Sequence, residues 1–194
     1  PSRLDLQIGQ LVVRRGGASF DRLWKPEAEG FSLDHIAVSD LNLTAELRAL
    51  TQDSVDVEVR RLDLRERSGL QVESLTFGLR AGRHDAALRD FLLRLPHSEL
   101  SLQEARVKPR LDDRSFSGLS ASLRTTIDPD DLLPLLPDGV LRMPALVDEV
   151  VPRGALHLAA RVTGGLDEVA VDGLHLWSAD RSLDLAGRVN YAEG

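Results

Sequence analysis

The feature that most constrains the fold is an apolar pattern, φxφxxφxφ, that returns along much of the chain. Apolar steps of two are the alternation of a β-strand. A step of three would turn the next apolar side chain to the other face, unless one extra residue is taken up as a bulge that also bends the strand. The pattern therefore predicts bent strands with one apolar face turned inward. Clear copies lie at 6–13, 36–43, 57–64, 70–77, 100–107 and 169–176.

A helix is the alternative for apolar steps of three. Here the steps alternate between two and three residues and fall short of the 3.6-residue helical period. Polar or glycine-containing groups also fall where hairpin turns are expected. These groups are at 15–17, 53–54, 68–69, 81–83, 96–98, 112–113, 164–165 and 179–180. They leave strands of about 5–9 residues with short connections, typical of an antiparallel meander. We predict an all-β, mainly antiparallel chain.

Residues 128–151 break this rhythm, with four of the nine prolines and consecutive leucines. Asp128 before Pro129 fits an N-cap followed by the first residue of a helix. One or two short helices are expected within 129–151. The predicted organisation is a bent β-segment at 1–127, a proline-rich helical connection at 128–152, and a second β-segment at 153–194 that continues the first. Residues 18–30 are expected to be irregular as well.

The composition excludes several kinds of site. The net charge of −7 argues against nucleic-acid binding. The absence of cysteine excludes disulfides, thiol catalysis and thiolate metal sites. The 22 arginines are interleaved with acids, as Glu58 and Arg60 illustrate, which indicates a solvated outer strand face. There is no apolar run of membrane-spanning length and no signal peptide. The chain begins at Pro1, and we expect it to be a segment of a longer protein whose anchor or targeting signal lies elsewhere.

The histidines provide the first candidates for chemistry. His157 and His175 each lie between two leucines on expected strands, where they would face solvent. Neighbouring strands could bring them together as metal ligands, but the spacing supplies no third ligand. His35, His84 and His97 are expected at the surface.

The acidic and glycine-containing segments are better explained structurally. Asp128, Asp130 and Asp131 alternate loosely like a calcium loop, yet the EF-hand spacing is missing and a helix start accounts for them. No serine occupies a nucleophile elbow, and no pair of carboxylates is singled out. We predict no enzymatic activity and no cofactor.

The apolar inner face is the remaining feature. A closed sheet would make it a filled core, the arrangement that the sequence favours, whereas an open curved sheet would make it a trough for acyl chains. Burying each methylene there would contribute about 0.8 kcal/mol. The candidate lining residues of such a groove are Leu33, Val38, Leu43, Val57, Leu64, Leu75, Phe77, Leu158, Val171 and Leu176.

The order of these features resembles the AsmA-like superfamily, in particular TamB-type proteins of Gram-negative envelopes in the versions found in Bacteroidetes. Three stretches carry the resemblance: residues 31–82, FSLDHIAVSDLNL and onward; residues 88–107, LRDFLLRLPHSELSLQEARV; and TTIDPDDLLPLLP at 125–137 with GALHLAARVTGG and onward at 154–189. Together they cover most of the chain.

The resemblance implies an elongated curved sheet with an apolar groove, the β-taco type, in a periplasmic segment of an inner-membrane-anchored protein. Such proteins are implicated in phospholipid transport between the membranes, or in outer-membrane protein assembly with a TamA- or BamA-like partner. That partner would be reached through parts outside this segment. A structural or adhesive β-solenoid with a closed core is the alternative, and it would require parallel coils of regular length.

Overall fold

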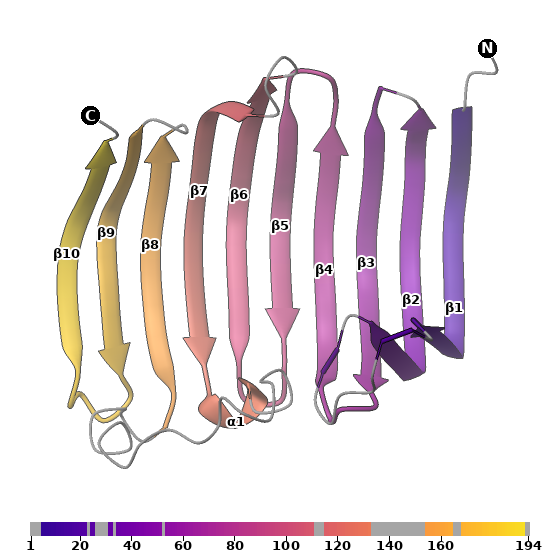
Figure 1. The fold of residues 1–194 in the computed structure, drawn as a ribbon, viewed down its shortest axis with the longest axis horizontal. Helices are drawn as coiled ribbons and strands as arrows, with labels where there is room; N and C mark the ends of the chain where they lie inside the picture. Colours follow the sequence, from indigo (N-terminus) through magenta and orange to yellow (C-terminus); the bar gives the residue numbers. More distant parts are fainter. Residues whose placement is uncertain are drawn as a thin grey trace.

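The fold is a single antiparallel β-meander. In the computed structural model the described residues are 5–22, 24–25, 31–32, 34–51, 53–110, 115–132, 154–164 and 168–192. Ten strands lie side by side in chain order, and each is antiparallel to its neighbours (Figure 1). They are β1 (Asp5–Asp21), β2 (His35–Thr51), β3 (Val55–Glu66), β4 (Gln71–Ala81), β5 (Ala86–Arg94), β6 (Glu99–Arg110), β7 (Ser115–Ile127), β8 (Leu156–Gly164), β9 (Glu168–Ser178) and β10 (Asp184–Ala192). The predicted all-β, antiparallel class is confirmed.

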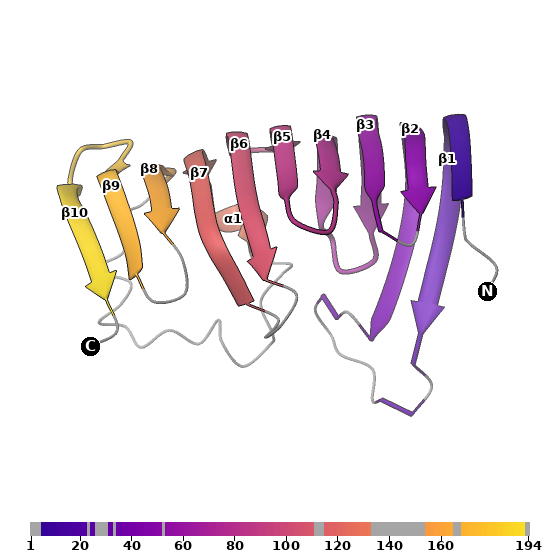
Figure 2. The same cartoon turned by 90° about the horizontal axis from the view of Figure 1, so that it is seen from above.

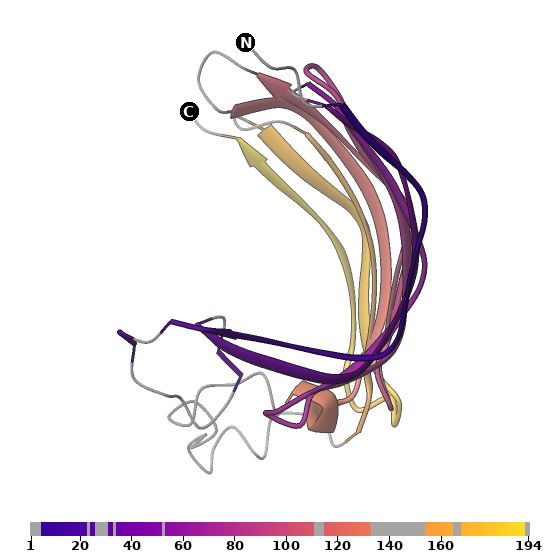
Figure 3. The ribbon, with the colours of Figure 1, turned by 90° about the vertical axis from the view of Figure 1, so that its right-hand side faces the viewer.

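The sheet is open and curved. β1 and β10 lie at its two ends, and each pairs with one neighbour (Figure 2). Seen from the β1 side, the strands bend along their length so that one face is concave (Figure 3). β8 pairs with β7 from Leu119 opposite Gly164 to Ile127 opposite Leu156, so the sheet continues across the connection between them.

The steps of three in the apolar pattern coincide with bulges. The register shifts between Ile8 and Leu11 in β1, between Val59 and Leu62 in β3, and between Leu102 and Ala105 in β6. Other bulges contain residues with positive φ, namely Arg15, Asp40, Asp90 and Gly173. The bulges return each apolar run to the same face, as the pattern predicts, and they increase the bend.

Two expectations about strand boundaries are wrong. Three strands, β5, β8 and β10, have nine residues and fall within the expected length of about 5–9, but the other seven have 11–17 residues because a bulge joins two apolar runs within one strand. Residues 15–17 are not a turn but lie inside β1, which continues through the start of the supposed irregular stretch to Asp21. Other turns fall as predicted: the Thr51 N–H donates to the Ser54 carbonyl, and the Leu95 N–H to that of Ser98. Residues 112–113 and Gly165 lie outside the described residues.

The short helix α1 (Pro129–Leu132) begins where the sequence predicts it. The Asp128 carboxylate accepts a hydrogen bond from the Asp130 N–H at 3.0 Å, which is N-cap geometry. Asp131 accepts the His97 N–H at 2.8 Å and so fixes the helix against the turn between β5 and β6. These roles account for the aspartates without calcium. Any second helix would fall at 133–151, outside the described residues.

Candidate functional site

The candidate site is one face of the sheet, which can be traced through the strand register. Residues directly opposite each other on paired strands share a face. Following the pairs from β1 to β10 gives one line, which we call the leucine row. Its members are Val13, Leu43, Leu62, Leu75, Leu93, Leu100, Thr125, Leu158, Leu176 and Leu185. One polar residue interrupts it, and the Thr125 hydroxyl donates to the Glu99 carbonyl at 3.0 Å.

A second line, the aliphatic row, crosses all ten strands without a polar residue. Its members are Ile8, Leu47, Val57, Leu79, Leu88, Ala105, Ala121, Val162, Val171 and Val189. Between the two rows, Phe77 and Phe91 stack with their ring centroids 6.4 Å apart. A further apolar line runs beyond the aliphatic row, from Leu6 and Leu50 to Leu119 and Val169.

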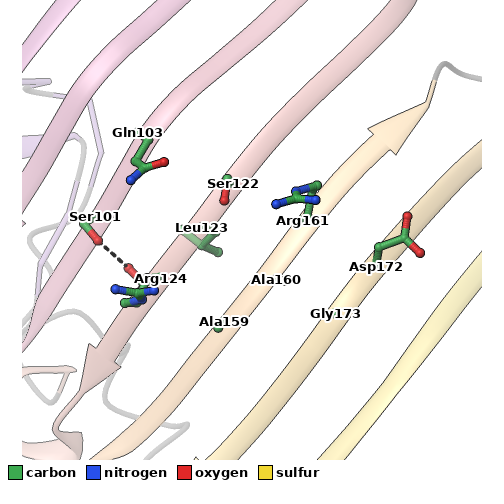
Figure 4. A pocket seen from close by; sticks show the side chains of 10 residues that line it. All are labelled: Ser101, Gln103, Ser122, Leu123, Arg124, Ala159, Ala160, Arg161, Asp172 and Gly173. Atoms are coloured by element: carbon green, nitrogen blue, oxygen red, sulfur yellow. Dashed lines mark hydrogen bonds between the residues drawn. The ribbon is translucent and has the colours of Figure 1, made fainter.

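These rows lie on the concave face. Figure 1 looks onto the concave side, which opens to the left in Figure 3. The β8 arrow points upward in both Figure 1 and Figure 4, but β8 lies to the left of β7 in the first and to its right in the second, so Figure 4 shows the opposite, convex side. The polar side chains of Gln103, Ser122 and Arg161 project from the face seen in Figure 4. The apolar residues alternate with them and project from the other face, the concave one (Figure 3).

No described residue outside the sheet covers the concave face. Within the described residues, Ala45 and Val59 are the buried hydrophobic residues, and the substantial contacts between elements run between neighbouring strands. Leu43, Leu75 and Leu158 are only half-buried although each has a member of the leucine row on both sides. The closed core that the sequence favours is therefore wrong for this part of the chain. The reason is that each strand pairs with its chain neighbours and β1 does not meet β10.

The candidate lining residues fall on this face in three groups. Four lie in the leucine row and two in the aliphatic row, and Phe77 lies between the rows. Val38, opposite Ala18, and Leu64, opposite Val72, lie towards the other end of their strands. The leucine row contains Leu43, Leu75, Leu158 and Leu176, and the aliphatic row contains Val57 and Val171. Leu33 lies outside the described residues.

Sequence reasoning missed most of β5. Leu88 and Leu93 belong to the two rows, but the consecutive pair Leu92–Leu93 hides which leucine faces inward. The register decides it: Leu93 lies between Leu75 and Leu100, whereas Leu92 lies between Thr76 and Ser101. The bulge at Asp90 could have been inferred from the step of three between Leu88 and Phe91.

The convex face is polar and carries many ion pairs between neighbouring strands, as the interleaved charges predict. Glu46 pairs with Arg60 at 2.7 Å, and Asp56 with Arg80 at 2.9 Å. Because these pairs are partly exposed, each contributes little to stability. Their effect is to keep the convex face hydrated while the opposite face stays apolar.

The strand register brings His157 and His175 together around one aromatic ring on the convex face. Their rings lie 5.2 and 4.3 Å from that of Trp177. His157 Nδ1 is 2.9 Å from the Thr126 hydroxyl, and His175 Nε2 is 2.9 Å from the Asp184 carboxylate. No group of three or more metal-ligating side chains forms within the described part of the chain. The two histidines are thus held by structural partners.

The expectation that His35 lies at the surface is wrong. It is 5% exposed at the start of β2, where Asp21 at the end of β1 lies opposite it. Its Nδ1 lies 3.4 Å from the Asp21 carboxylate and its Nε2 lies 3.1 Å from the Lys25 carbonyl. His84 and His97 are exposed, as expected.

Comparison with known proteins yields no relative: no protein family, curated protein or solved structure matches this chain. Within the described residues, no helix has both the length and the apolar character needed to cross a membrane.

Proposed function

We propose that this chain is a non-catalytic β-groove segment of an AsmA-like, TamB-type envelope protein, and that its concave face holds acyl chains of phospholipid in transit between membranes. The observation that carries the proposal is the set of apolar rows that cross the open sheet without a covering layer in the described residues. An exposed apolar surface of this extent in a folded protein is typical of a binding surface.

The chemistry of the face suits an acyl chain better than a polar ligand. An acyl chain makes no hydrogen bonds, and the two rows present aliphatic side chains, with the Thr125 hydroxyl already bonded to backbone. Each methylene buried against them would contribute about 0.8 kcal/mol.

The direction of the apolar rows suits movement of an acyl chain across the sheet. The rows run across the strands, and neighbouring strands are about 4.8 Å apart, so ten strands form an apolar track roughly 43 Å long. An extended chain moving along this track would meet nearly the same surroundings at every strand. Because the binding free energy would be nearly the same at every strand, the acyl chain could move along the rows without stopping at one strongly bound position.

The placement in the cell rests on the family resemblance. We place the segment in the periplasm as part of an inner-membrane-anchored protein that takes part in phospholipid transport or outer-membrane protein assembly. An outer-membrane TamA- or BamA-like partner would bind through other parts of the protein.

An interaction module, with a protein partner covering the concave face, is the second candidate, and the same exposed apolar rows favour it. Its β-solenoid form does not agree with the structure, because every strand pair in the described residues is antiparallel. Lipid binding by the isolated chain separates the two candidates.

The test compares two adjacent leucines that face opposite ways. Leu93→Asp places a charge in the leucine row, and Leu92→Asp places the same charge on the convex face between Thr76 and Ser101. Native mass spectrometry after incubation with phospholipid should show bound lipid masses for the natural chain and for Leu92→Asp. For Leu93→Asp we expect roughly tenfold less lipid, because a charge beside an acyl chain must be desolvated.

Both variants are first compared with the natural chain by circular dichroism, so that loss of fold is not mistaken for loss of binding. If Leu93→Asp is poorly folded, Leu75→Asp, on the neighbouring strand of the same row, takes its place. A lipid-free mass under all conditions, or equal loss in both leucine variants, would contradict the proposal and favour a protein partner.

A further inference from the structure

A separate hollow lies on the convex face, between β6 and β9 (Figure 4). It has a volume of about 410 Å³ and is lined by polar side chains around small residues. Its base is formed by Ala159, Ala160 and Gly173. Gly173 sits in the β9 bulge with φ +59°, and a Cβ there would meet no atom within 4 Å. The positive φ at this bulge favours glycine over residues with a side chain.

Two arginines border the hollow on neighbouring strands. Arg124 lies opposite Ala159, and Arg161 lies opposite Ser122, so the two are diagonal neighbours with Cα atoms roughly 7–8 Å apart. Both side chains are exposed and line the hollow. Like charges on neighbouring strands repel each other, and an anion bound between the two side chains would remove that repulsion.

Neither arginine of the hollow pairs with a described carboxylate. Arg60, Arg80 and Arg106, on the same face, each pair with a carboxylate at 2.7–2.9 Å. Within the described residues, no carboxylate lies within 4.0 Å of the guanidinium of Arg124 or Arg161.

The nearest acid in the register does not fill this gap. Asp172 also lines the hollow and lies opposite Arg161, but its carboxylate pairs with Arg188 at 2.6 Å. The hollow is therefore locally positive on a chain whose net charge is −7.

We infer that this hollow binds a phosphate group. Guanidinium forks bind phosphate oxygens in bidentate fashion, and two forks on diagonal positions can grip one group from two sides. The Ser122 hydroxyl and the Gln103 amide lie in the same lining and supply neutral donors. The site is on the opposite face from the apolar rows, so this inference does not rest on the proposed function. The phosphate could belong to a small soluble ester or to a lipid headgroup at a membrane surface.

The first arm of the test is a titration with inorganic phosphate at constant ionic strength, balanced with chloride and followed by ¹H–¹⁵N NMR. We expect saturable shifts of the Ser122, Arg124 and Arg161 amides. Arg124→Gln and Arg161→Gln should each weaken binding by about tenfold, since a charge-assisted bidentate contact is lost. Arg161→Lys keeps the charge without the fork and should give an intermediate loss.

The matched control is Arg65→Gln. Arg65 is exposed on β3 and lies between Ser39 and Gln71 in the register, away from the hollow, so phosphate affinity should stay within about twofold. The altered arginines are all exposed, and circular dichroism verifies the fold. Shifts that do not saturate, that chloride reproduces, or that Arg65→Gln weakens equally would overturn the inference.

The second arm identifies the source of the phosphate by sedimentation with vesicles of phosphatidylcholine, with and without phosphatidic acid. Binding to phosphatidic acid that requires Arg124 and Arg161 supports a headgroup site, whereas saturable free phosphate without vesicle binding supports a small soluble ester. If neither binds through the two arginines, the inference fails. The Leu93→Asp variant should keep its phosphate affinity, so failure here is distinguishable from failure of the acyl-chain proposal.

Discussion

At the scale of single residues, the turn between β9 and β10 shows how serines can hold one carboxylate ionised. Asp180 accepts hydrogen bonds from the Ser178 hydroxyl at 2.6 Å and from the Ser182 hydroxyl and N–H at 2.8 and 3.0 Å. These bonds, that of Ser178 foremost, lower the pKa of Asp180 from 3.8 to about 2. Because folding lowers this pKa, the carboxylate stabilises the fold fully above pH 3.8, and the contribution is lost as the pH falls through about 2.

Ser178→Ala should raise the pKa of Asp180 towards 3.8, which carboxyl ¹³C NMR measures. Ser178 is 1% exposed and its hydroxyl also accepts the Leu183 N–H at 3.0 Å. The free energy of unfolding in urea should therefore fall by about 1–3 kcal/mol. Ser182→Ala is the control, with a smaller pKa change because its backbone donor remains. An unchanged pKa in Ser178→Ala would contradict this account.

At the scale of elements, the bulges keep the apolar side chains of each strand on one face. They do so by placing some residues in the positive-φ region, which is unfavourable for most residues. Asp40 and Asp90 both have φ +52°, a region that aspartate tolerates better than most residues. Asp90 lies where the register of β5 against β4 shifts between Thr76 and Gly78. Without that extra residue, Leu88 and Phe91 would face opposite sides of the sheet.

The effect of a substitution at Asp90 on stability should depend on how well the new residue adopts a positive φ, and not on the loss of the charge. Asp90→Gly should be neutral or stabilise the protein by up to about 1 kcal/mol, because glycine adopts positive φ freely. Asp90→Val should destabilise it by about 1–2 kcal/mol, because a β-branched side chain is strained there. Urea unfolding measures both, with exposed Arg89→Val as the control expected within about 0.5 kcal/mol. Equal stability of the glycine and valine variants would show that no positive-φ bulge exists.

At the scale of the whole molecule, the described part of the chain forms one ten-stranded sheet, and its stability depends on strand pairing. β4, β5 and β6 have several paired strands on each side, whereas β1 and β10 have one neighbour each. The exposed apolar residues of the edge strands, Leu11 at 44% and Val189 at 51% among them, show how little covers those ends. Local opening should therefore begin at the two ends of the sheet.

Hydrogen exchange followed by NMR should show a gradient of protection, with the slowest amides in β4–β6 and the fastest in β1 and β10. The comparison uses amides that are hydrogen-bonded between strands, so that free edge groups do not bias the result. Uniform protection over all ten strands would mean that the sheet opens as one cooperative unit, or that its ends are covered in solution.

The pattern of two- and three-residue steps is sufficient to predict the all-β class, the bulges and the apolar face. The polar and glycine-containing groups predict most hairpin turns, and Asp128 before Pro129 predicts the start of α1. These are local consequences of side-chain alternation and capping, and they need only neighbouring residues. Strand length could not be predicted, since a bulge and a turn look alike in a short polar stretch such as Arg15–Gly17.

Three features were decided by the tertiary structure. Whether the sheet closes depends on β1 meeting β10, and no local pattern encodes the distance between two strands so far apart in sequence. The burial of His35 depends on residues that the fold brings beside it, Asp21 opposite it in β1 and the Lys25 carbonyl 3.1 Å from its Nε2. The arginine-lined hollow exists because the register sets Arg124 and Arg161 diagonally beside small residues. By itself the sequence determined which side chains face inward on the strands with clear alternation, because alternation is a property of each strand. On β5 the register had to choose between Leu92 and Leu93. The open trough and the arginine pair arise from pairing between strands, which only the whole sheet fixes.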